Sequence, residues 1–255
     1  MAGFSGQGQV SLGLRLASGR PDVMRWIGNA SAFKLGQSAD RVERKESYSG
    51  NRNPHRAMTA TRGATLQITF DEWNNENMRW IAQGDIQQVA AGAFNDWVAP
   101  TSATKKGDRI MLPWRDITIA ANGIKDSAGS PVTINQSKWK LTDAKTGVEL
   151  LETLTGISAP LKLTGTYAAH QVMGAFNMLS SEAYVRFEGI NTDTGKFEIV
   201  DVFRVRLDPA KEVDLINNDN FADFQLDGTM LIDSTRVASG PGGQMWQMLR
   251  ENGVE

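Results

Sequence analysis

The 255-residue chain contains no cysteine, only 2 histidines and only 8 prolines. The absence of cysteine excludes a disulfide framework, a thiolate nucleophile, a zinc–thiolate site and an iron–sulfur cluster. A chain of this length buries roughly three quarters of its unfolded surface, so a packed core needs none of these cross-links. Apolar packing and hydrogen bonds are therefore expected to hold the fold.

The sequence also lacks an excess of either charge and any long apolar run. It carries 27 Lys and Arg against 29 Asp and Glu, a net charge of -2, whereas a free-standing nucleic-acid-binding protein needs a basic surface. No apolar run approaches the ~20 residues of a membrane span. Met1–Gly8 has no signal-peptide pattern. We expect a protein that is made and initially kept in a cytoplasm, without membrane association.

Catalytic and metal-binding patterns are missing too. His55 and His170 show no HExxH or other paired-ligand spacing, and no GxSxG or SxxK sequence nominates a serine nucleophile. Residues 189–196 fail as a phosphate loop because five residues separate the glycines and Phe197 stands where Ser or Thr would bind magnesium. We expect a β-hairpin there, and neither enzymatic activity nor a cofactor or metal in the protein.

What the sequence does contain is 25 glycines and many short turn-like clusters between apolar stretches, which is typical of a β-rich fold. Gln9–Leu16 and the longer Ala57–Phe70 alternate apolar and polar residues, which predicts strands with one buried face. Turns at Asp143–Gly147 and Asn191–Gly195 are expected to place glycine at positive φ. Further strands are predicted in six runs, namely Arg109–Ala120, Val132–Leu141, Leu161–Tyr167, Ala183–Ile190, Lys196–Leu207 and Phe221–Asp233.

Two helices are predicted beside these strands. Asp71 can cap the first, and Gly84 can end it. The residues at helical spacing between them are Trp73, Asn77, Trp80 and Ile81. Gly242–Asn252 carries four large apolar residues and is interpreted as a short terminal helix. Because no low-complexity linker or internal repeat is visible, residues 1–255 are expected to form one domain, with Asp96–Asp108 as its most flexible loop.

The seven tryptophans allow two interpretations. Three lie in helical or apolar stretches, where packing is the expected role: Trp73, Trp80 and Trp246. Three others, Trp97, Trp114 and Trp139, lie in loop or strand positions with polar neighbours. Because buried tryptophans often carry much of the energy of a binding interface, these three are candidate interface anchors.

Asp40–Glu46 is the densest cluster of charges in the chain, with residues of both signs. On a strand, this segment would place charges on both faces. One interpretation is an ordinary solvated strand end. The other is a surface that meets water or charged partners on both sides, which is natural in a β-structure that is completed only on assembly.

The order and spacing of several segments resemble those of the tail tube (major tail) proteins of long-tailed bacteriophages. The resemblance extends from about residue 26 to residue 233 and has three parts. The first comprises Ile27–Leu35, the charged strand 40–46, the polar loop Ser47–His55, the alternating strand to Phe70, and Asp71–Asn77. The second comprises Arg109–Pro113, Trp139–Glu149 and Leu163–Ala169. The third comprises Val185–Gly189 with the hairpin after it, Val202–Asp208 and Phe221–Gly228.

This resemblance implies a mainly β subunit, a β-sandwich or barrel-like tail-tube fold with a flanking α-helix. Six copies would close a ring, and rings would stack into a hollow tube in the tail of the virion after assembly in the host cytoplasm. The lumen would hold the tape measure protein and later pass phage DNA without specific binding. The tail terminator and distal tail proteins would be further partners.

The resemblance also implies roles for particular residues, although it leaves the Gly-rich N-terminus and the segment 85–106 without one. A polar assembly loop at about residues 47–56 would make the contact between rings, through Tyr48, Gly50, Asn51, Arg52, Asn53, Pro54, His55 and Arg56. The lumen wall is expected to be polar with mixed or net negative charge, because a basic wall would trap DNA. Its expected residues include Asp40, Glu43 and Glu46. The alternative function is a β-sandwich carbohydrate- or receptor-binding module that uses loop tryptophans.

Overall fold

The computed structural model describes residues 4–178, 182–217, 222–240 and 242–250. The chain is mainly β, as the sequence predicts, and these ranges contain antiparallel sheets and one α-helix where two helices are expected. No helix in the described ranges is long and apolar enough to cross a membrane. The chain divides into two compact units, unit 1 (Met1–Asp85 with Gly174–Glu255) and unit 2 (Ile86–Met173), where the sequence suggests one domain.

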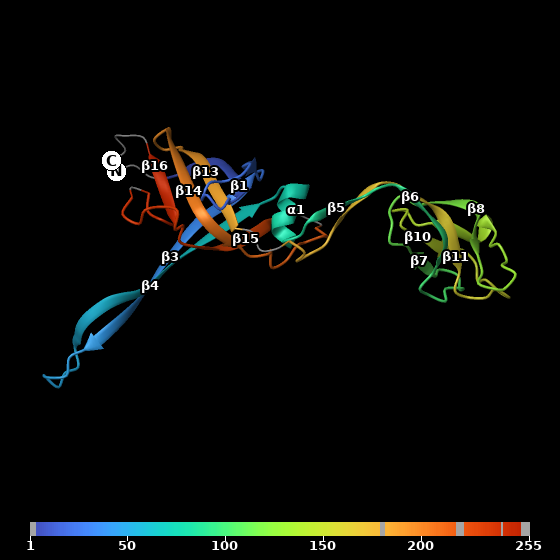
Figure 1. The fold of residues 1–255 in the computed structure, drawn as a ribbon, viewed down its shortest axis with the longest axis horizontal. Helices are drawn as coiled ribbons and strands as arrows, with labels where there is room; N and C mark the ends of the chain where they lie inside the picture. The colour runs from blue at the N-terminus through green and yellow to red at the C-terminus, as the bar shows by residue number, and fades with distance from the viewer. Residues whose placement is uncertain (1–3, 179–181, 218–221, 241, 251–255) are drawn as a thin grey trace. The chain divides into compact units, whose positions relative to one another are not determined.

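Unit 1 is built on an eight-stranded sheet in the order β2-β1-β13-β14-β15-β4-β3, with β16 as an additional partner of β14 (Figure 1). All of its pairings are antiparallel. Its strands are β1 (Gly6–Leu14), β2 (Arg25–Trp26), β3 (Ala30–Lys45), β4 (Pro54–Phe70), β13 (Glu182–Asn191), β14 (Lys196–Leu207), β15 (Phe224–Met230) and β16 (Trp246–Arg250).

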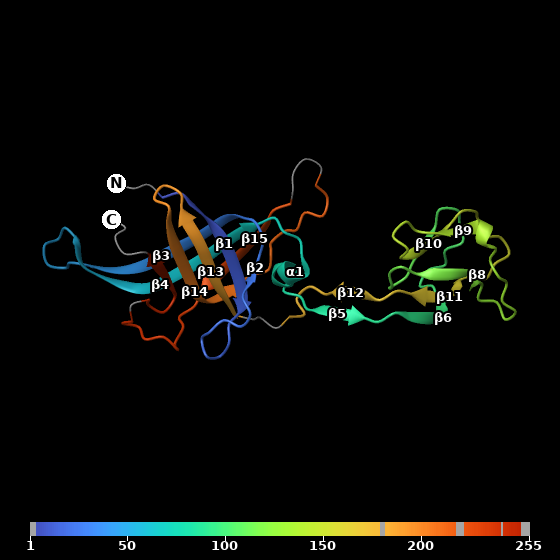
Figure 2. The ribbon, with the colours of Figure 1, turned by 90° about the horizontal axis from the view of Figure 1, so that it is seen from above.

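The sheet curls so that its end strand β3 returns toward β13. Phe33 of β3 stacks on Phe187 of β13 with a centroid distance of 5.4 Å, although no hydrogen-bonded pairing joins these strands among the described residues. Figure 2 shows the strands of this sheet crossing one another. The buried residues of unit 1 include Val10 and Leu12 of β1, Leu66, Ile68 and Phe70 of β4, Val200 and Val202 of β14, and Phe224 and Leu226 of β15.

Helix α1 (Asn75–Ala82) follows β4 but is shorter than predicted. Its N-cap is Asn74 rather than Asp71, because the Asn74 side chain accepts a hydrogen bond from the backbone amide of Asn77 at 2.9 Å. Its C-cap is Gln83, with a φ of 45°, rather than Gly84. Trp73 therefore lies outside the helix, where it is 55% exposed and its ring lies 5.5 Å from that of Phe224.

The predicted C-terminal helix is wrong. Within the described part of this segment, residues 246–250 form strand β16, which pairs with Glu198–Val202 of β14. Side chains reinforce this pairing, since Gln247 Nε2 donates to Asp201 Oδ2 at 2.9 Å and Arg250 forms an ion pair with Glu198. A helix here would leave that edge of β14 without backbone partners, which is costly inside a folded protein.

The other predicted strands mostly match the structure. The runs ending in Phe70, Tyr167 and Leu207 correspond to strands with nearly the same bounds. The run 109–120 divides into two strands, and the run 132–141 contains a short 3-10 helix (Gln136–Lys138) before a strand. The hairpin at 189–196 is confirmed, with Gly195 at a φ of 69°.

The other predicted turn differs in detail. Lys145, and not Gly147, takes the positive φ, at 48°. Gly147 is needed for a different reason, because a Cβ atom there would lie 2.6 Å from the carbonyl oxygen of Ile110 on the neighbouring strand. The glycine therefore permits close strand approach rather than the turn conformation.

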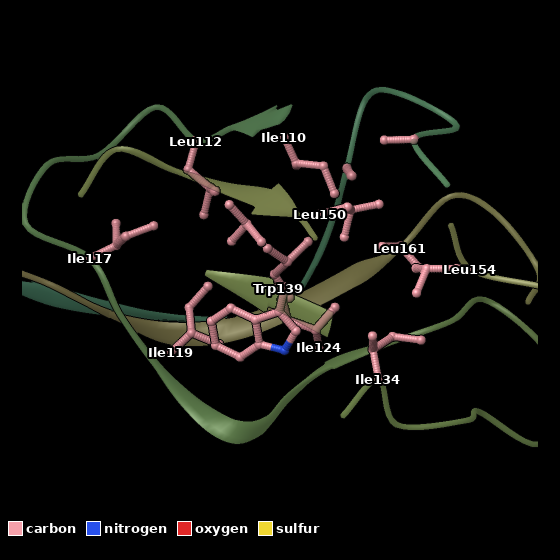
Figure 3. Packing of buried hydrophobic residues seen from close by; sticks show 14 of the residues in the cluster. Ile110, Leu112, Ile117, Ile119, Ile124, Ile134, Trp139, Leu150, Leu154 and Leu161 are labelled. Atoms are coloured by element: carbon pink, nitrogen blue, oxygen red, sulfur yellow. The ribbon is translucent and has the colours of Figure 1, made fainter. Parts of the chain in front are cut away.

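Unit 2 consists of three small antiparallel sheets, β7-β10-β9, β6-β11-β8 and β12-β5. Their strands are β5 (Ile86–Val89), β6 (Gly92–Val98), β7 (Arg109–Met111), β8 (Thr118–Lys125), β9 (Trp139–Leu141), β10 (Gly147–Leu150), β11 (Lys162–Tyr167) and β12 (His170–Met173). Figure 3 shows that unit 2 has its own hydrophobic core, in which Trp139 lies among isoleucine and leucine side chains.

Within unit 1, the two segments that flank unit 2 in the sequence are hydrogen-bonded to each other. The backbone amide of Phe176 donates to the carbonyl of Ala82 at 3.0 Å, and that of Met178 donates to Gln83 at 3.0 Å. The amide of Asp85 also donates to Asn177 Oδ1 at 2.5 Å. Unit 1 therefore holds the two ends of the insertion together by its own contacts.

Candidate functional site

The most exposed element of unit 1 is the outer part of the β3–β4 hairpin, residues 37–63, which we call the arm. β15 pairs with β4 only from Ala64 to Phe70, so beyond Ala64 the two arm strands pair only with each other among the described strands. Every arm residue is exposed except Glu46, which is half-buried. The change from buried to exposed side chains occurs within β4, since Leu66, Ile68 and Phe70 are buried whereas Met58 is 67% exposed. The predicted burial of one face of β4 thus holds only for its inner part.

The loop at the tip of the arm covers residues 46–53, so it ends earlier than the loop at 47–56 that the sequence suggests. β3 ends at Lys45 and β4 begins at Pro54, so Pro54, His55 and Arg56 already belong to a strand. The amide of Glu46 donates to the carbonyl of Asn53 at 2.9 Å and closes the loop. The Ser49 hydroxyl donates to the Glu46 carboxylate, and this bond is the main cause of the lowered pKa of Glu46.

The structure brings together all the residues predicted to contact another ring. Gly50, Asn51, Arg52 and Asn53 lie in the loop, at exposed positions. Gly50 and Arg52 adopt positive φ values of 79° and 52°. Tyr48 is 78% exposed, and its ring meets the edge of His55 at a centroid distance of 6.1 Å. These residues form one continuous exposed surface at the end of the arm.

The three carboxylates predicted to face the lumen also lie on the arm. Asp40 accepts a hydrogen bond from the Thr61 hydroxyl across the hairpin at 2.5 Å, Glu43 is exposed, and Glu46 belongs to the loop. The arm carries these three acidic residues and six basic ones, a net charge of +3, so the rest of the chain carries -5. The carboxylates therefore lie on a surface of mixed charge that is basic overall, whereas the expected lumen wall is polar with mixed or net negative charge.

The six basic residues of the arm, Arg41, Arg44, Lys45, Arg52, Arg56 and Arg62, form no ion pair within the described residues. Arg44 and Arg56 are direct cross-strand neighbours, and Val42 and Met58 form the next pair on the same face. Like charges directly opposite each other destabilise a strand pair. In the isolated chain, this face of the arm combines an exposed apolar pair with unbalanced positive charge.

Sequence reasoning did not find a groove between β1, β3, β13, β14 and β16, which has a volume of about 640 Å³. Its apolar walls include Val10, Phe33, Phe187, Val200 and Met248.

The carboxylate of Glu198 also lines this groove. Glu198 is 3% exposed, whereas the preceding residue, Phe197, is 62% exposed. Glu198 Oε1 lies 3.3 Å from Arg250 Nε, while Oε2 is buried and has no hydrogen-bond partner in the described structure. The signal in the sequence is the alternation in β14, in which Glu198, Val200 and Val202 occupy one face.

The candidate tryptophan anchors are less available than predicted. Trp139 is 4% exposed and belongs to the core of unit 2. Trp114 is half-buried and contacts two rings that are nearly parallel to it, Phe94 at 4.9 Å and Tyr167 at 5.1 Å. Trp97 is half-buried and meets Trp114 at a steep angle. Trp114 thus stacks on two other rings of unit 2.

Two buried carboxylates of unit 1, Asp201 and Asp233, form ion pairs with arginines of the same unit. Burial raises the pKa of Asp201, but hydrogen bonds from Arg186 and Gln247 lower it more, so the net shift is downward. Burial also raises the pKa of the neighbouring Tyr184, to about 12. Asp233 likewise has a lowered pKa, because hydrogen bonds from Thr235 and Arg15 outweigh its burial. These groups connect strands and loops of the unit and do not line the groove.

Neither histidine belongs to a metal site in the described structure. His55 is exposed at the start of β4, and His170 makes a ring-nitrogen contact of 2.9 Å with the carbonyl of Ala168. Among the residues that the structure describes, no group of three or more His, Asp or Glu side chains could hold a metal ion.

Comparison with known proteins gives a family but no activity. No curated protein matches the sequence. The model of a family described as "Protein of unknown function UCP028589" matches residues 3–247, which is nearly the whole chain, and the protein belongs to this family.

Proposed function

We propose that the protein is a structural subunit of a bacteriophage tail tube. Copies close into rings, and the rings stack into a hollow conduit. The resemblance to tail tube proteins implies six copies in each ring. The conduit holds the tape measure protein and passes phage DNA, and its ends meet the tail terminator and distal tail proteins. The subunit is assembled in the host cytoplasm and resides in the tail of the virion.

The observation that carries this proposal is the arm. Among the described strands, the two outer backbone edges of the arm have no pairing partner, and such edges in a monomer invite association with another chain. Its six basic residues lack ion-pair partners in the described structure, and Val42 and Met58 are more than half exposed. A contact with another copy accounts for all three features, whereas none of them stabilises the subunit alone.

The net positive charge of the arm indicates which surface of the tube the arm occupies. A wall that neutralises phosphates releases counterions and holds DNA in place. Because the arm has twice as many basic as acidic residues, we assign it to contacts between copies and not to the lumen wall. The assignment of Asp40, Glu43 and Glu46 to the lumen is correspondingly less favoured, whereas the contact role of residues 47–56 is kept.

The proposal assigns no catalytic activity, cofactor or metal to the chain. The alternative, a carbohydrate- or receptor-binding module, requires aromatic faces that a ligand can stack on. Trp139 is buried and Trp114 is half-buried against the parallel rings of Phe94 and Tyr167, so these two tryptophans offer a ligand less aromatic surface than this function needs. A saturable glycan-binding isotherm of the monomer would favour the alternative.

The proposed function is tested by negative-stain electron microscopy and sedimentation velocity of the purified protein over a range of concentrations. Rings or tubes of uniform diameter are expected at high concentration, with a concentration-dependent rise in sedimentation coefficient. A protein that remains a monomer throughout the series contradicts the proposal.

A further inference from the structure

We propose that the arm of one copy docks in the groove of a second copy that contains Glu198. In this contact, Val42 and Met58 cover the apolar walls of the groove, and Arg44 or Arg56 pairs with the Glu198 carboxylate. The inference rests on the proposed self-assembly and names the surface that receives the arm.

The groove has the character of a binding surface because, in the part of the chain that the structure describes, strand edges beside it lack backbone partners. In β1, residues 6–9 pair with β13 on one edge, while β2 reaches only Ser11 and Leu12 on the other. β3 pairs with β4 alone among the described strands. Ser31 of β3 is exposed where it lines the groove. An extended segment from another chain could therefore reach both the apolar walls and unpaired backbone groups.

Glu198 indicates the charge of the occupant. A buried carboxylate without full pairing is costly, because it loses hydration without regaining equivalent hydrogen bonds. Its only ion-pair partner in the described structure, Arg250, is 48% exposed, and Oε2 is buried with no hydrogen-bond donor. A guanidinium group brought by a partner would supply the missing donor in a charge-assisted hydrogen bond.

The arm supplies that chemistry in matching order. Val42 and Met58, which are 55% and 67% exposed, lie directly opposite each other, and Arg44 and Arg56 are the next pair on the same face. The arm therefore presents two apolar side chains beside two cations, while the groove presents apolar walls beside a carboxylate. The net charges of +3 for the arm and -5 for the rest of the chain also favour docking between copies.

A second copy explains the arm better than a nucleic acid does. Phosphates would satisfy Arg44 and Arg56 but would leave Val42 and Met58 exposed to solvent. They would also leave the Glu198 carboxylate without a donor. A second copy satisfies all of these groups in one contact.

Cross-linking tests the contact directly, because the chain has no cysteine of its own. One tagged copy carries Met58→Cys, and a differently tagged copy carries Ser31→Cys at the rim of the groove. The mixture is treated with a short bismaleimide or oxidised. The matched control is Thr59→Cys, because Thr59 is adjacent in the strand but its side chain points to the opposite face. We expect cross-linked dimers of the two tags with Met58→Cys and far fewer with Thr59→Cys.

A charge reversal tests the ionic part of the same contact. The double variant Arg44→Glu/Arg56→Glu, combined with Met58→Cys, is expected to lower the cross-linking yield by about tenfold. The matched variant Arg41→Glu/Lys45→Glu has the same change in charge on neighbouring positions of β3 and is expected to retain most of the yield. Equal losses in both variants would show that only net charge matters and would overturn the pairing with Glu198.

The outcomes separate this inference from the proposed function. Tubes without the specific cross-link would refute the groove as the receiving surface but leave the tube function intact. The specific cross-link without tubes would support the contact and count against the tube function. If neither Cys pair cross-links, and duplex DNA shows a mobility shift that the Arg44→Glu/Arg56→Glu variant abolishes, the arm binds nucleic acid and the inference is wrong.

Discussion

Truncation of the arm should separate assembly from folding. Ala39 and Arg62 are direct partners in the hairpin, so residues 40–61 can be replaced by an Asn-Gly turn between them. Asn-Gly favours the tight turns that join two antiparallel strands. The variant keeps all of the buried residues of β4, which begin at Ala64. We expect it to fold as a monomer and to form no rings or tubes.

The expected change in stability is small because the removed residues bury almost nothing. All of them are exposed except Glu46, and changes at such surface positions usually alter the free energy of unfolding by about 0.5 kcal/mol or less. A change of 1 kcal/mol shifts the melting temperature of a domain of this size by about 2–4 °C. The melting temperature of the truncated monomer should therefore stay within about 4 °C of that of the intact chain.

Differential scanning calorimetry at low protein concentration measures the first result, and negative-stain microscopy at high concentration measures the second. Leu66→Ala is the control for sensitivity, because Leu66 is 1% exposed and its loss should cost about 2–5 kcal/mol. A truncated protein that still forms normal tubes would refute the role of the arm in assembly. A truncated protein that melts as early as Leu66→Ala would refute the reasoning that the arm lies outside the core.

Three further predictions concern the units and their buried charges. Joining Asp85 to Gly174 through a short Gly/Ser linker should leave unit 1 folded, because the two segments that flank unit 2 are already hydrogen-bonded to each other. Thermal unfolding followed by circular dichroism should show a cooperative transition. A protein without a cooperative transition would contradict this prediction. Asp201→Asn should lower the free energy of unfolding by about 1–3 kcal/mol, because it weakens a buried charged hydrogen-bond network; urea titration measures this, and an unchanged midpoint argues against it. The pKa values of Asp201 and Asp233 are lowered in the folded state, so their stabilisation is present above the unfolded-state pKa, near 4, and is lost as the pH falls below it. Urea titrations at pH 7 and pH 3 should show this loss, with a smaller loss in Arg186→Gln, and equal losses in both proteins would refute the assignment.

Much of the β structure could be predicted from the sequence, because half-buried strands impose a two-residue alternation. Lys196–Leu207 matches its strand at both ends. The C-terminal segment could not be assigned in the same way, since large apolar residues in a run this short are compatible with a helix or a strand. Only the unpaired edge of β14 decides in favour of the strand, and that edge is a tertiary feature.

The division into two units left no clear signal in the sequence. The chain enters unit 2 through β5 and leaves it through β12, and these strands pair with each other. A linker rich in Gly, Ser or Pro would have marked the boundary, but a paired ribbon has the composition of any other strand. The N-cap of α1 is hard to predict for a related reason, since Asp71, Asn74 and Asn75 can all serve as N-caps and tertiary contacts decide between them.

The candidate site shows where local rules fail and why. A strand with Phe197 and Glu198 side by side would ordinarily bury the phenylalanine, yet the structure buries the glutamate. If the register of β14 slipped by one residue, Phe197 would be buried and Glu198 exposed. The same slip would expose Val200 and Val202, which are buried on the same face as Glu198. The burial of Glu198 is thus imposed by the rest of β14, and its cost persists in the isolated subunit.

Arg44 and Arg56 are a second destabilising feature, here of positive charge, since the pairing of β3 with β4 sets these two arginines directly opposite each other. Proteins tolerate such local costs where function requires them. A single contact between copies that joins the arm to the groove would relieve both costs together. The proposed assembly therefore stabilises the parts of the chain that its own fold leaves unsatisfied.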